Sequence, residues 1–264
     1  MKCFDPVNIE NKKYNGFNFK RLLVPCGHCA ACLQRKRNVW SYRLSYELKS
    51  HEKAVFITLT YSDENVPKDG VSIRDCQLFL KRLRKTHKLR YYLVSEYGTN
   101  TRRPHYHAII FGLSSADINI IDSAWSKGFV SVGNVNSASI NYTTKYMITK
   151  DIEDDDTVNK PFSLMSRKPM LGSNYVDNMA DWHKADLTRN YSPDKGGKKM
   201  PLHRGYREKI YDGIDLPDFS YDESKEEAEY LKTNPDRSYY TDKFDRQEHI
   251  QKKFFKQISK QSKL

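Results

Sequence analysis

The sequence between residues 54 and 149 alternates between the hydrophobic periods of strands and helices, and this restricts the fold more than any other feature. Residues 54–61 (AVFITLTY) are rich in β-branched and aromatic side chains, as is typical of a strand. Further elements are expected in the order helix, strand, strand, helix, strand and helix at residues 76–87, 90–96, 105–111, 116–125, 129–135 and 137–149. We expect Asp75 to cap the first of these helices. The first six elements fit a ferredoxin-like split βαβ, an antiparallel sheet with helices on one face, so the sequence predicts an α+β fold whose other sheet face is free for a site.

The character of the sequence divides the chain into three expected domains. Residues 1–50 hold a cluster of cysteines and a basic helix over about residues 33–48. Residues 51–150 hold the core. Residues 151–264 form a charged C-terminal extension, in which periodic sequence after about residue 223 indicates helices with little core.

The charge of the chain is strongly basic, with 45 Lys and Arg against 33 Asp and Glu and a net charge of +12. Such an excess attracts polyanions and supports nucleic-acid binding that weakens with salt. The basic residues gather beside aromatic ones, which favours nucleic acid over an evenly charged surface. Contacts with DNA phosphates are expected from basic side chains of two helices and one loop: Arg35, Arg37, Arg43, Lys81, Arg82 and Arg103. The sequence has no run of about 18 apolar residues and no secretory signal, so we expect an intracellular protein with no membrane partner.

The cysteines form the first candidate site. Three of the five lie in the segment 26–32 (CGHCAAC), which is too tight for a disulfide framework. Together with Cys3 or His28, the thiolates of Cys26, Cys29 and Cys32 can bind a structural Zn²⁺. The same spacing also occurs in iron–sulfur sites and in redox-active thiol clusters, and the sequence leaves these alternatives open.

A pair of histidines on one strand forms the second candidate site. His105 and His107 lie two residues apart, so alternation places both imidazoles on one face of the sheet and Tyr106 on the other. Two neutral imidazoles can hold a divalent cation and leave open positions for substrate. Glu96 ends the preceding strand, and a hairpin would bring its carboxylate near both histidines as a third ligand.

Two tyrosines on one helix form the third candidate site. Tyr142 and Tyr146 are spaced i and i+4, so both phenols can point at one target, with Lys145 beside them. A tyrosine nucleophile must lose its proton, and its target phosphorus must be polarised. A nearby ammonium favours the phenolate, and a metal on the phosphate supplies the polarisation.

These segments resemble motifs I, II and III of the HUH endonucleases that initiate rolling-circle replication. The segments are 56–61 (FITLTY), 103–107 (RPHYH) and 142–146 (YTTKY). The flanking sequence is similar to the replication initiators of small single-stranded DNA phages, the Microviridae of gokushovirus type. That similarity is carried by segments 25–32 (PCGHCAAC), 80–84 (LKRLR), 95–98 (SEYG) and 165–169 (MSRKP). The resemblance covers about residues 1–175.

The resemblance implies an endonuclease that nicks single-stranded origin DNA, forms a 5′-phosphotyrosine link and later religates it. It implies Mg²⁺ or Mn²⁺ held by His105 and His107, with Glu96 as the third ligand. The nucleophile would be Tyr142 or Tyr146, with Tyr142 ranked first because its spacing to Lys145 fits the pattern Tyr-x-x-Lys. The partners implied are origin DNA and the host replication machinery, including a helicase because the sequence has no Walker motif. The location implied is the cytoplasm of a bacterial host.

Other readings remain at this point. A ferredoxin-like sheet with exposed aromatic residues can bind single-stranded nucleic acid without cutting it. A relaxase or transposase would use the same HUH chemistry in another setting. A zinc-stabilised DNA-binding regulator would rely on the cysteine cluster alone. A covalent protein–DNA adduct separates the enzymes from the binding proteins.

Overall fold

The computed structural model describes residues 3–12, 20–98, 101–149, 158–193, 197, 199–214 and 223–261. Its contacts divide the chain into two compact units, residues 36–212 and residues 1–35 together with residues 213–264. The second unit contains an antiparallel strand pair and two helices: β1 (Val7–Glu10), β2 (Arg21–Val24), α7 (Glu223–Thr233) and α8 (Tyr239–Gln261). Both helices lie where the sequence indicated helices after about residue 223.

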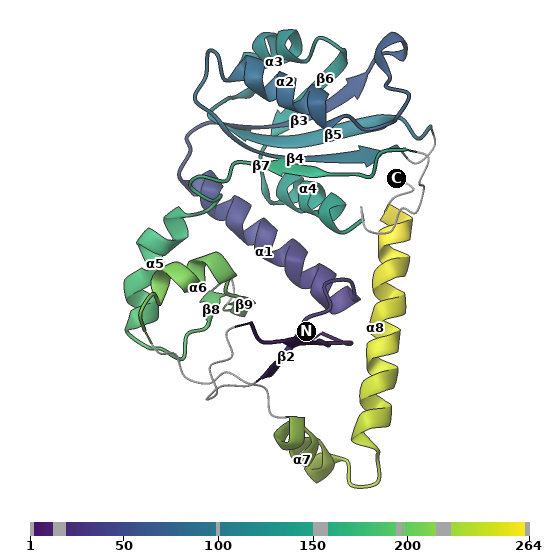
Figure 1. Ribbon diagram of the computed structural model, residues 1–264, viewed down its shortest axis with the longest axis vertical. Helices are drawn as coiled ribbons and strands as arrows, with labels where there is room; N and C mark the ends of the chain where they lie inside the picture. Colours follow the sequence, from purple (N-terminus) through teal and green to yellow (C-terminus); the bar gives the residue numbers. More distant parts are fainter. Residues whose placement is uncertain are drawn as a thin grey trace. The chain divides into compact units, whose positions relative to one another are not determined.

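A five-stranded antiparallel sheet forms the centre of the larger unit (Figure 1). The strands follow the spatial order β6-β3-β5-β4-β7, with the bounds β3 (Ala54–Tyr61), β4 (Arg90–Tyr97), β5 (Pro104–Phe111), β6 (Gly128–Asn134) and β7 (Ser163–Met165). The helices associated with this sheet are α1 (Ala30–Lys49), α2 (Ile73–Leu83), α3 (Ile118–Trp125) and α4 (Ser137–Thr149). The first four strands with α2 and α3 form the split βαβ that the sequence predicted, which confirms the α+β fold class. Strand β7 is an additional edge strand.

Helices cover both faces of the sheet, and each face has its own hydrophobic core (Figure 1). On one face, α2 and α3 pack against side chains such as Ile57 and Tyr106. On the other face, Val94 packs with Leu44 of α1 and Ile140 of α4. The expectation that helices cover only one face was wrong, because α1 and α4 also carry apolar residues that a sheet face can bury. The second face is therefore open only where these two helices leave it uncovered.

The helix after β3 begins earlier than the sequence indicated. We expected Asp75 to cap it, but Ser72 is the cap, because its hydroxyl accepts a hydrogen bond from the Asp75 N–H at 3.2 Å. The Asp75 carboxylate instead accepts a hydrogen bond from the Tyr61 hydroxyl at 2.8 Å. It also pairs with the Lys127 ammonium at 3.3 Å.

The segment after β7 adds short elements that the sequence did not reveal. These are α5 (Asn174–Lys184), β8 (Tyr191–Pro193), β9 (Lys199–Pro201) and α6 (Arg204–Ile210). Short 3₁₀ turns, η1 (Asp63–Asn65) and η2 (Ser115–Asp117), lie in the loops after β3 and β5. None of the helices in the described part of the chain has the length and apolarity needed to cross a membrane.

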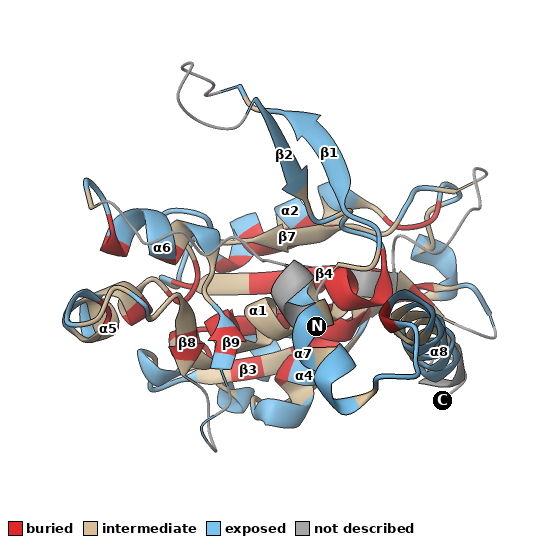
Figure 2. Cartoon of the chain, turned by 90° about the horizontal axis from the view of Figure 1, so that it is seen from below, coloured by how far each residue is buried: buried red, intermediate tan, exposed pale blue. Residues whose placement is uncertain are grey.

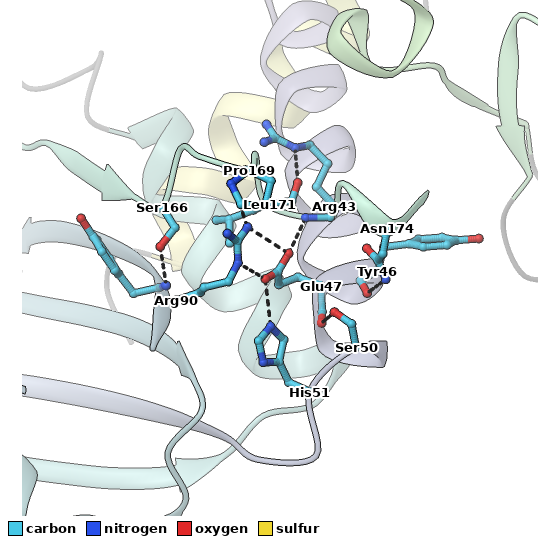
Figure 3. A network of polar contacts seen from close by, with 12 residues as sticks. Arg43, Tyr46, Glu47, Ser50, His51, Arg90, Ser166, Pro169, Leu171 and Asn174 are labelled. Atoms are coloured by element: carbon cyan, nitrogen blue, oxygen red, sulfur yellow. Dashed lines mark hydrogen bonds and ion pairs between the residues drawn. The ribbon is translucent and has the colours of Figure 1, made fainter. Parts of the chain in front are cut away.

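A buried carboxylate fixes α1 against the sheet (Figure 3). Glu47 of α1 forms an ion pair with Arg90 at the start of β4 and lies 3.0 Å from Nε2 of His51. Its second oxygen accepts a hydrogen bond from the N–H of Gly172 at 2.6 Å. Gly172 has φ +73, and a Cβ there would lie 2.6 Å from the Arg43 carbonyl, so this close approach requires glycine. One side chain thus joins α1, β4 and the loop after β7.

Candidate active site

Strand register brings the predicted metal ligands to one face of the sheet. His107 pairs with Thr58 of β3 on one side and with Val94 of β4 on the other. His105 pairs directly with Glu96 of β4, so their side chains point to the same face. Tyr106, between the histidines, lies in the opposite core beneath α2 and α3. The alternation expected from the sequence is therefore present.

His107 is the most constrained of these side chains. It is 4% exposed, its Nε2 lies 2.7 Å from Oε1 of Glu96, and its Nδ1 lies 3.0 Å from the Thr58 hydroxyl. Both ring nitrogens therefore have a polar partner, and the ring orientation is fixed. His105 Nδ1 lies 2.8 Å from the carbonyl of Arg103. Because a carbonyl only accepts, Nδ1 of His105 carries the proton and Nε2 is the nitrogen left to bind a cation.

The donor set of Glu96, His105 and His107 suits a divalent cation in its chemistry, with two imidazoles and one carboxylate. Neighbouring ligands that each lie about 2.1 Å from a cation are about 3 Å apart, close to the separation of Glu96 and His107. In the described part of the chain, however, the group of metal-binding side chains whose ligand atoms all lie within 4.8 Å of one another is a set of cysteines. His105 would therefore have to move closer to act as the third ligand.

Helix α4 carries the predicted tyrosines to His107. The ring centroids of Tyr142 and His107 are 5.1 Å apart and nearly perpendicular, and those of Tyr146 and His107 are 5.1 Å apart and stacked. The two tyrosine rings lie 5.0 Å from each other. The tyrosines of α4 therefore lie beside an expected metal ligand, on the same face of the sheet.

The start of α4 explains this placement. Asn136 accepts a hydrogen bond from the Ser139 N–H at 2.9 Å, and the Ser139 hydroxyl accepts one from the Asn136 N–H at 2.8 Å. One turn later Ile140 is buried in the core of the second face. With that residue packed against the sheet, the i and i+4 spacing turns Tyr142 and Tyr146 together toward His107.

Burial and charge both keep the tyrosines protonated. The pKa of Tyr142 is raised mainly by burial and further by the negative charge of Glu96, although its hydrogen bond with Tyr146 opposes the rise. Burial, then Glu96, also raises the pKa of Tyr146. Burial lowers the pKa of Lys145, whose Nζ lies 5.5 Å from the centre of the Tyr146 ring. Tyr142 is 42% exposed and is the more accessible tyrosine.

The basic residues expected to contact DNA occupy different environments. Arg37 lies nearest to the site, because its Nη2 donates a hydrogen bond at 3.4 Å to the carbonyl of Asn141, next to Tyr142. Arg43 is 7% exposed and donates to the carbonyl of Leu171 at 3.1 Å, so it belongs to the interior.

The other expected DNA contacts lie away from His107 or in a loop. Lys81 and Arg82 are exposed on α2, which covers the opposite face of the sheet. Arg103 donates to the carbonyl of Tyr61 at 2.8 Å and pairs with Asp63. Arg35 is exposed and belongs to the smaller unit.

The sequence did not single out two neighbours of His107. Thr58 was expected mainly to pack in the sheet, but its hydroxyl orients the imidazole. Phe56 lies parallel to the His107 ring with a centroid distance of 6.0 Å. Alternation along β3 placed both residues on one face, but only the pairing of β3 with β5 shows that this face holds the histidines.

The expected cysteine site is also assembled. Cys3, Cys26, Cys29 and Cys32 form the compact set whose ligand atoms lie within 4.8 Å of one another. Cys76, as expected, is instead a buried residue of α2 in the first core.

Comparison with known proteins identifies the family. The family of replication-associated proteins of the ORF2 type matches residues 54–151. Replication-associated protein ORF2 of Spiroplasma virus 4 is 30% identical over 250 residues, covering 76% of this chain and 78% of that protein. Replication-associated protein VP4 of Bdellovibrio phage phiMH2K is 25% identical over 244 residues, covering 79% of this chain and 76% of that protein.

Among solved structures, the N-terminal nuclease domain of minute virus of mice non-structural protein 1 covers 66% of this chain and 93% of that chain. Its sequence identity of 10% and TM-score of 0.20 are too low to carry an argument. The sequence relatives suffice, because the match at 30% identity extends over more than three quarters of both chains. They confirm the resemblance to phage replication initiators that the motifs indicated, and the chain belongs to the family of phage replication-associated proteins.

Proposed function

We propose that this protein starts rolling-circle replication of a phage genome by nicking single-stranded origin DNA with a tyrosine of α4. The observation that carries the proposal is the position of Tyr142 and Tyr146, whose rings both lie 5.1 Å from the ring of His107. A non-catalytic binding module has no need to gather two phenols, an imidazole and a carboxylate on one sheet face. The family of replication-associated proteins supplies the biological setting.

The metal in this proposal is Mg²⁺ or Mn²⁺, held by Glu96, His105 and His107. When bound, it would polarise the scissile phosphate and stabilise the negative charge that develops there. The protein's own part is positional. Thr58 and Glu96 fix the His107 ring, so the ligand that lies beside the tyrosines needs little reorganisation on binding.

In the cleavage step, Oη of Tyr142 attacks the scissile phosphorus while the bond from phosphorus to the 3′-oxygen breaks. The phenol proton is released, and the departing 3′-oxygen takes up a proton to become a free 3′-hydroxyl. The product is a 5′-phosphotyrosine ester, and no oxidant or reductant is consumed. In religation, a 3′-hydroxyl attacks the same phosphorus and the phenol departs.

Tyr142 is our choice for the first cut, because it is 42% exposed whereas Tyr146 is partly buried against His107. Two charges assist loss of the phenol proton. A cation bound by Glu96 would offset the negative charge that raises the pKa of both tyrosines, and the nearby ammonium of Lys145 favours the phenolate. Tyr146 is then available for a second cut in the same replication cycle.

The experiment uses labelled single-stranded oligonucleotides tiled across the genome that encodes this chain, incubated with the full-length protein and Mn²⁺. We expect a covalent protein–DNA adduct that is lost when Tyr142→Phe and Tyr146→Phe are combined. Tyr240→Phe is the matched control, because Tyr240 is 56% exposed on α8 of the other unit, and it should leave adduct formation unchanged. Binding without an adduct on every oligonucleotide would instead support the non-catalytic module.

The proposed partners follow from this activity. The substrate is single-stranded DNA at the replication origin, and strand separation falls to a helicase of the host replication machinery. The proposed location is the cytoplasm of a bacterial host. Pull-down of the host helicase in the presence of origin DNA, compared with a sample lacking that DNA, tests the assignment.

A further inference from the structure

We propose that Cys3, Cys26, Cys29 and Cys32 bind one structural Zn²⁺ that fastens both ends of the β1–β2 hairpin to the start of α1. This site lies wholly within the smaller unit and does not depend on the proposed nuclease activity. The sequence left zinc, an iron–sulfur cluster and a redox-active thiol cluster open, and it left Cys3 and His28 as alternatives for the fourth ligand.

The distances between the sulfur atoms match a tetrahedral zinc site. Sγ of Cys26 lies 3.9 Å from Sγ of Cys32, and Sγ of Cys29 lies 3.9 Å from Sγ of Cys3. With zinc–sulfur bonds of about 2.3 Å, the edge of a tetrahedron is about 3.8 Å. A disulfide would hold its two sulfur atoms at about 2 Å, and the described cysteines are all free thiols. In an iron–sulfur cluster the thiolates bind different irons and must stand farther apart than the edge of one tetrahedron.

Backbone N–H groups surround the sulfur atoms as they do around metal-bound thiolates. The N–H of Cys26 donates to Sγ of Cys3 at 3.2 Å, and the N–H of Cys29 donates to Sγ of Cys26 at 3.4 Å. Such bonds stabilise negative charge on sulfur, which four thiolates around one cation require. Gly27 has φ +87 and permits the tight turn that points the Cys29 N–H back at Cys26.

The fourth ligand is Cys3 rather than His28. The His28 imidazole is exposed, and its Nδ1 lies 3.1 Å from the carbonyl of Cys26. It does not belong to the set of ligand atoms that lie within 4.8 Å of one another, whereas Cys3 does. Zinc would therefore connect residues that are 23 positions apart, across the hairpin, rather than only a local turn.

The position of the ligands explains why a metal is needed there. Cys3 precedes β1 and Cys26 follows β2, so the two ligands close the base of the hairpin, and Cys29 and Cys32 lie at the start of α1. The hairpin has no buried residue in either strand, and Figure 2 shows it exposed along its length. A two-stranded hairpin without a hydrophobic face is marginal in water, so it needs such a fastening. Gln251 of α8 adds a further contact by accepting the N–H of Ala30 at 2.9 Å.

The test measures metal bound to the full-length protein, purified under reducing conditions without chelator, by elemental mass spectrometry. To remove any contribution from the proposed nuclease site, the protein carries His105→Ala and His107→Ala. We expect one zinc and no stoichiometric iron per chain. Replacement by Co²⁺ should give the intense visible absorption of tetrahedral thiolate ligation. Iron in place of zinc, disulfides in the freshly purified protein, or no bound metal with all thiols reduced would each overturn the proposal.

Variants separate the four-cysteine site from a local knuckle. Cys3→Ser should weaken zinc binding by at least about a hundredfold and make the β1–β2 segment exchange its amide hydrogens faster. Cys76→Ser is the matched control, because it also removes a buried thiol but lies in the core of the other unit, and it should keep one zinc. Undiminished zinc affinity in the Cys3 variant would refute the four-cysteine site. If that variant does not fold, stepwise zinc release from the parent protein by a mercurial reagent gives the same information, with four thiols consumed per zinc expected.

Discussion

His107 connects the two halves of the proposed chemistry in a single side chain. Its edge contacts Glu96 and Thr58, which belong to the strands on either side of β5, and its ring contacts both tyrosines of α4. Any change in the orientation of this imidazole would therefore be felt by the metal ligands and by the nucleophiles together. Thr58 is the residue best suited to test that coupling, because it touches neither the tyrosines nor the expected substrate in any contact described above.

Replacing Thr58 with Val removes the hydroxyl that holds Nδ1 of His107 while keeping a similar volume. We expect the apparent affinity for Mn²⁺ in the nicking assay to fall by about 10-fold to 100-fold, because ligand orientation is lost. The thermal midpoint should change little. Thr58→Ser keeps the hydroxyl and should restore metal affinity; a Ser variant as impaired as the Val variant would mean that packing, rather than the hydrogen bond, is what matters.

A second histidine gives the larger unit a dependence on pH. Burial, and then the positive charge of Arg43, lower the pKa of His203 to about 4 from its ordinary value near 6.5. The unfolded chain therefore binds a proton between about pH 6.5 and pH 4 that the folded chain does not. The free energy of unfolding should fall as the pH decreases through this window.

His203→Asn should reduce this loss, because Asn does not titrate and can still accept the Gly205 N–H at the start of α6. The measurement is the urea midpoint at several pH values across the window between the two pKa values of His203. His249→Asn, on the exposed surface of α8, is the control and should keep the parent profile. A His203→Asn protein that loses as much stability on acidification as the parent would contradict the assignment.

The elements of the fold differ in how well the sequence reveals them. Strand β3 and helix α4 were predicted with their observed bounds, because their patterns are long and end at clear breaks. The hairpin of β4 and β5 was also foreseen, and with it the closeness of Glu96 to the histidines, because a short loop specifies its register. The pairing of Thr58 with His107 joins strands that are distant in the sequence, and no local turn indicates it.

Other elements left no readable pattern. Strands β1 and β2 are almost entirely exposed and do not alternate. Strand β7 has three residues and depends on the edge of β4 for its existence. The packing of α1 and α4 on the second face could not be predicted either, since an apolar stripe shows that a helix is buried but not against which surface.

The anchoring of α1 gives a test at the level of these elements. Glu47→Ala would leave the guanidinium of Arg90 and the N–H of Gly172 without their buried carboxylate (Figure 3). We expect the free energy of unfolding to fall by about 3 kcal/mol, as is typical when one partner of a buried pair is removed. Glu52→Ala, at an exposed position, should change it by less than about 0.5 kcal/mol. Equal effects of both substitutions in urea denaturation would show that the pair does not anchor the helix.

The whole molecule carries a net charge of +12, and this should govern how it meets single-stranded DNA. Each phosphate neutralised by a basic side chain releases counterions, so the logarithm of the binding constant falls linearly with the logarithm of the salt concentration. Basic residues near His107 should contribute to this slope, and those on α2 should not, because α2 covers the opposite face of the sheet.

Arg37→Gln should reduce the magnitude of the slope by about 0.7, the value for one phosphate contact on single-stranded DNA. Lys81→Gln removes the same charge from α2 and should leave the slope close to that of the parent protein. The measurement is fluorescence anisotropy with a labelled oligonucleotide over a range of salt concentrations. If the two variants change the slope equally, DNA does not distinguish the two faces of the sheet.

The covalent chemistry itself is tested most directly by locating the DNA on the protein. After incubation with origin DNA and Mn²⁺, the adduct is digested with nuclease and protease, and the modified peptide is identified by mass spectrometry. We predict a nucleotide linked through phosphate to Tyr142 in the parent protein, and to Tyr146 when Tyr142 is replaced by Phe. A nucleotide attached to any residue outside α4, or a nicked product with no attached residue, would contradict a tyrosine nucleophile on this helix.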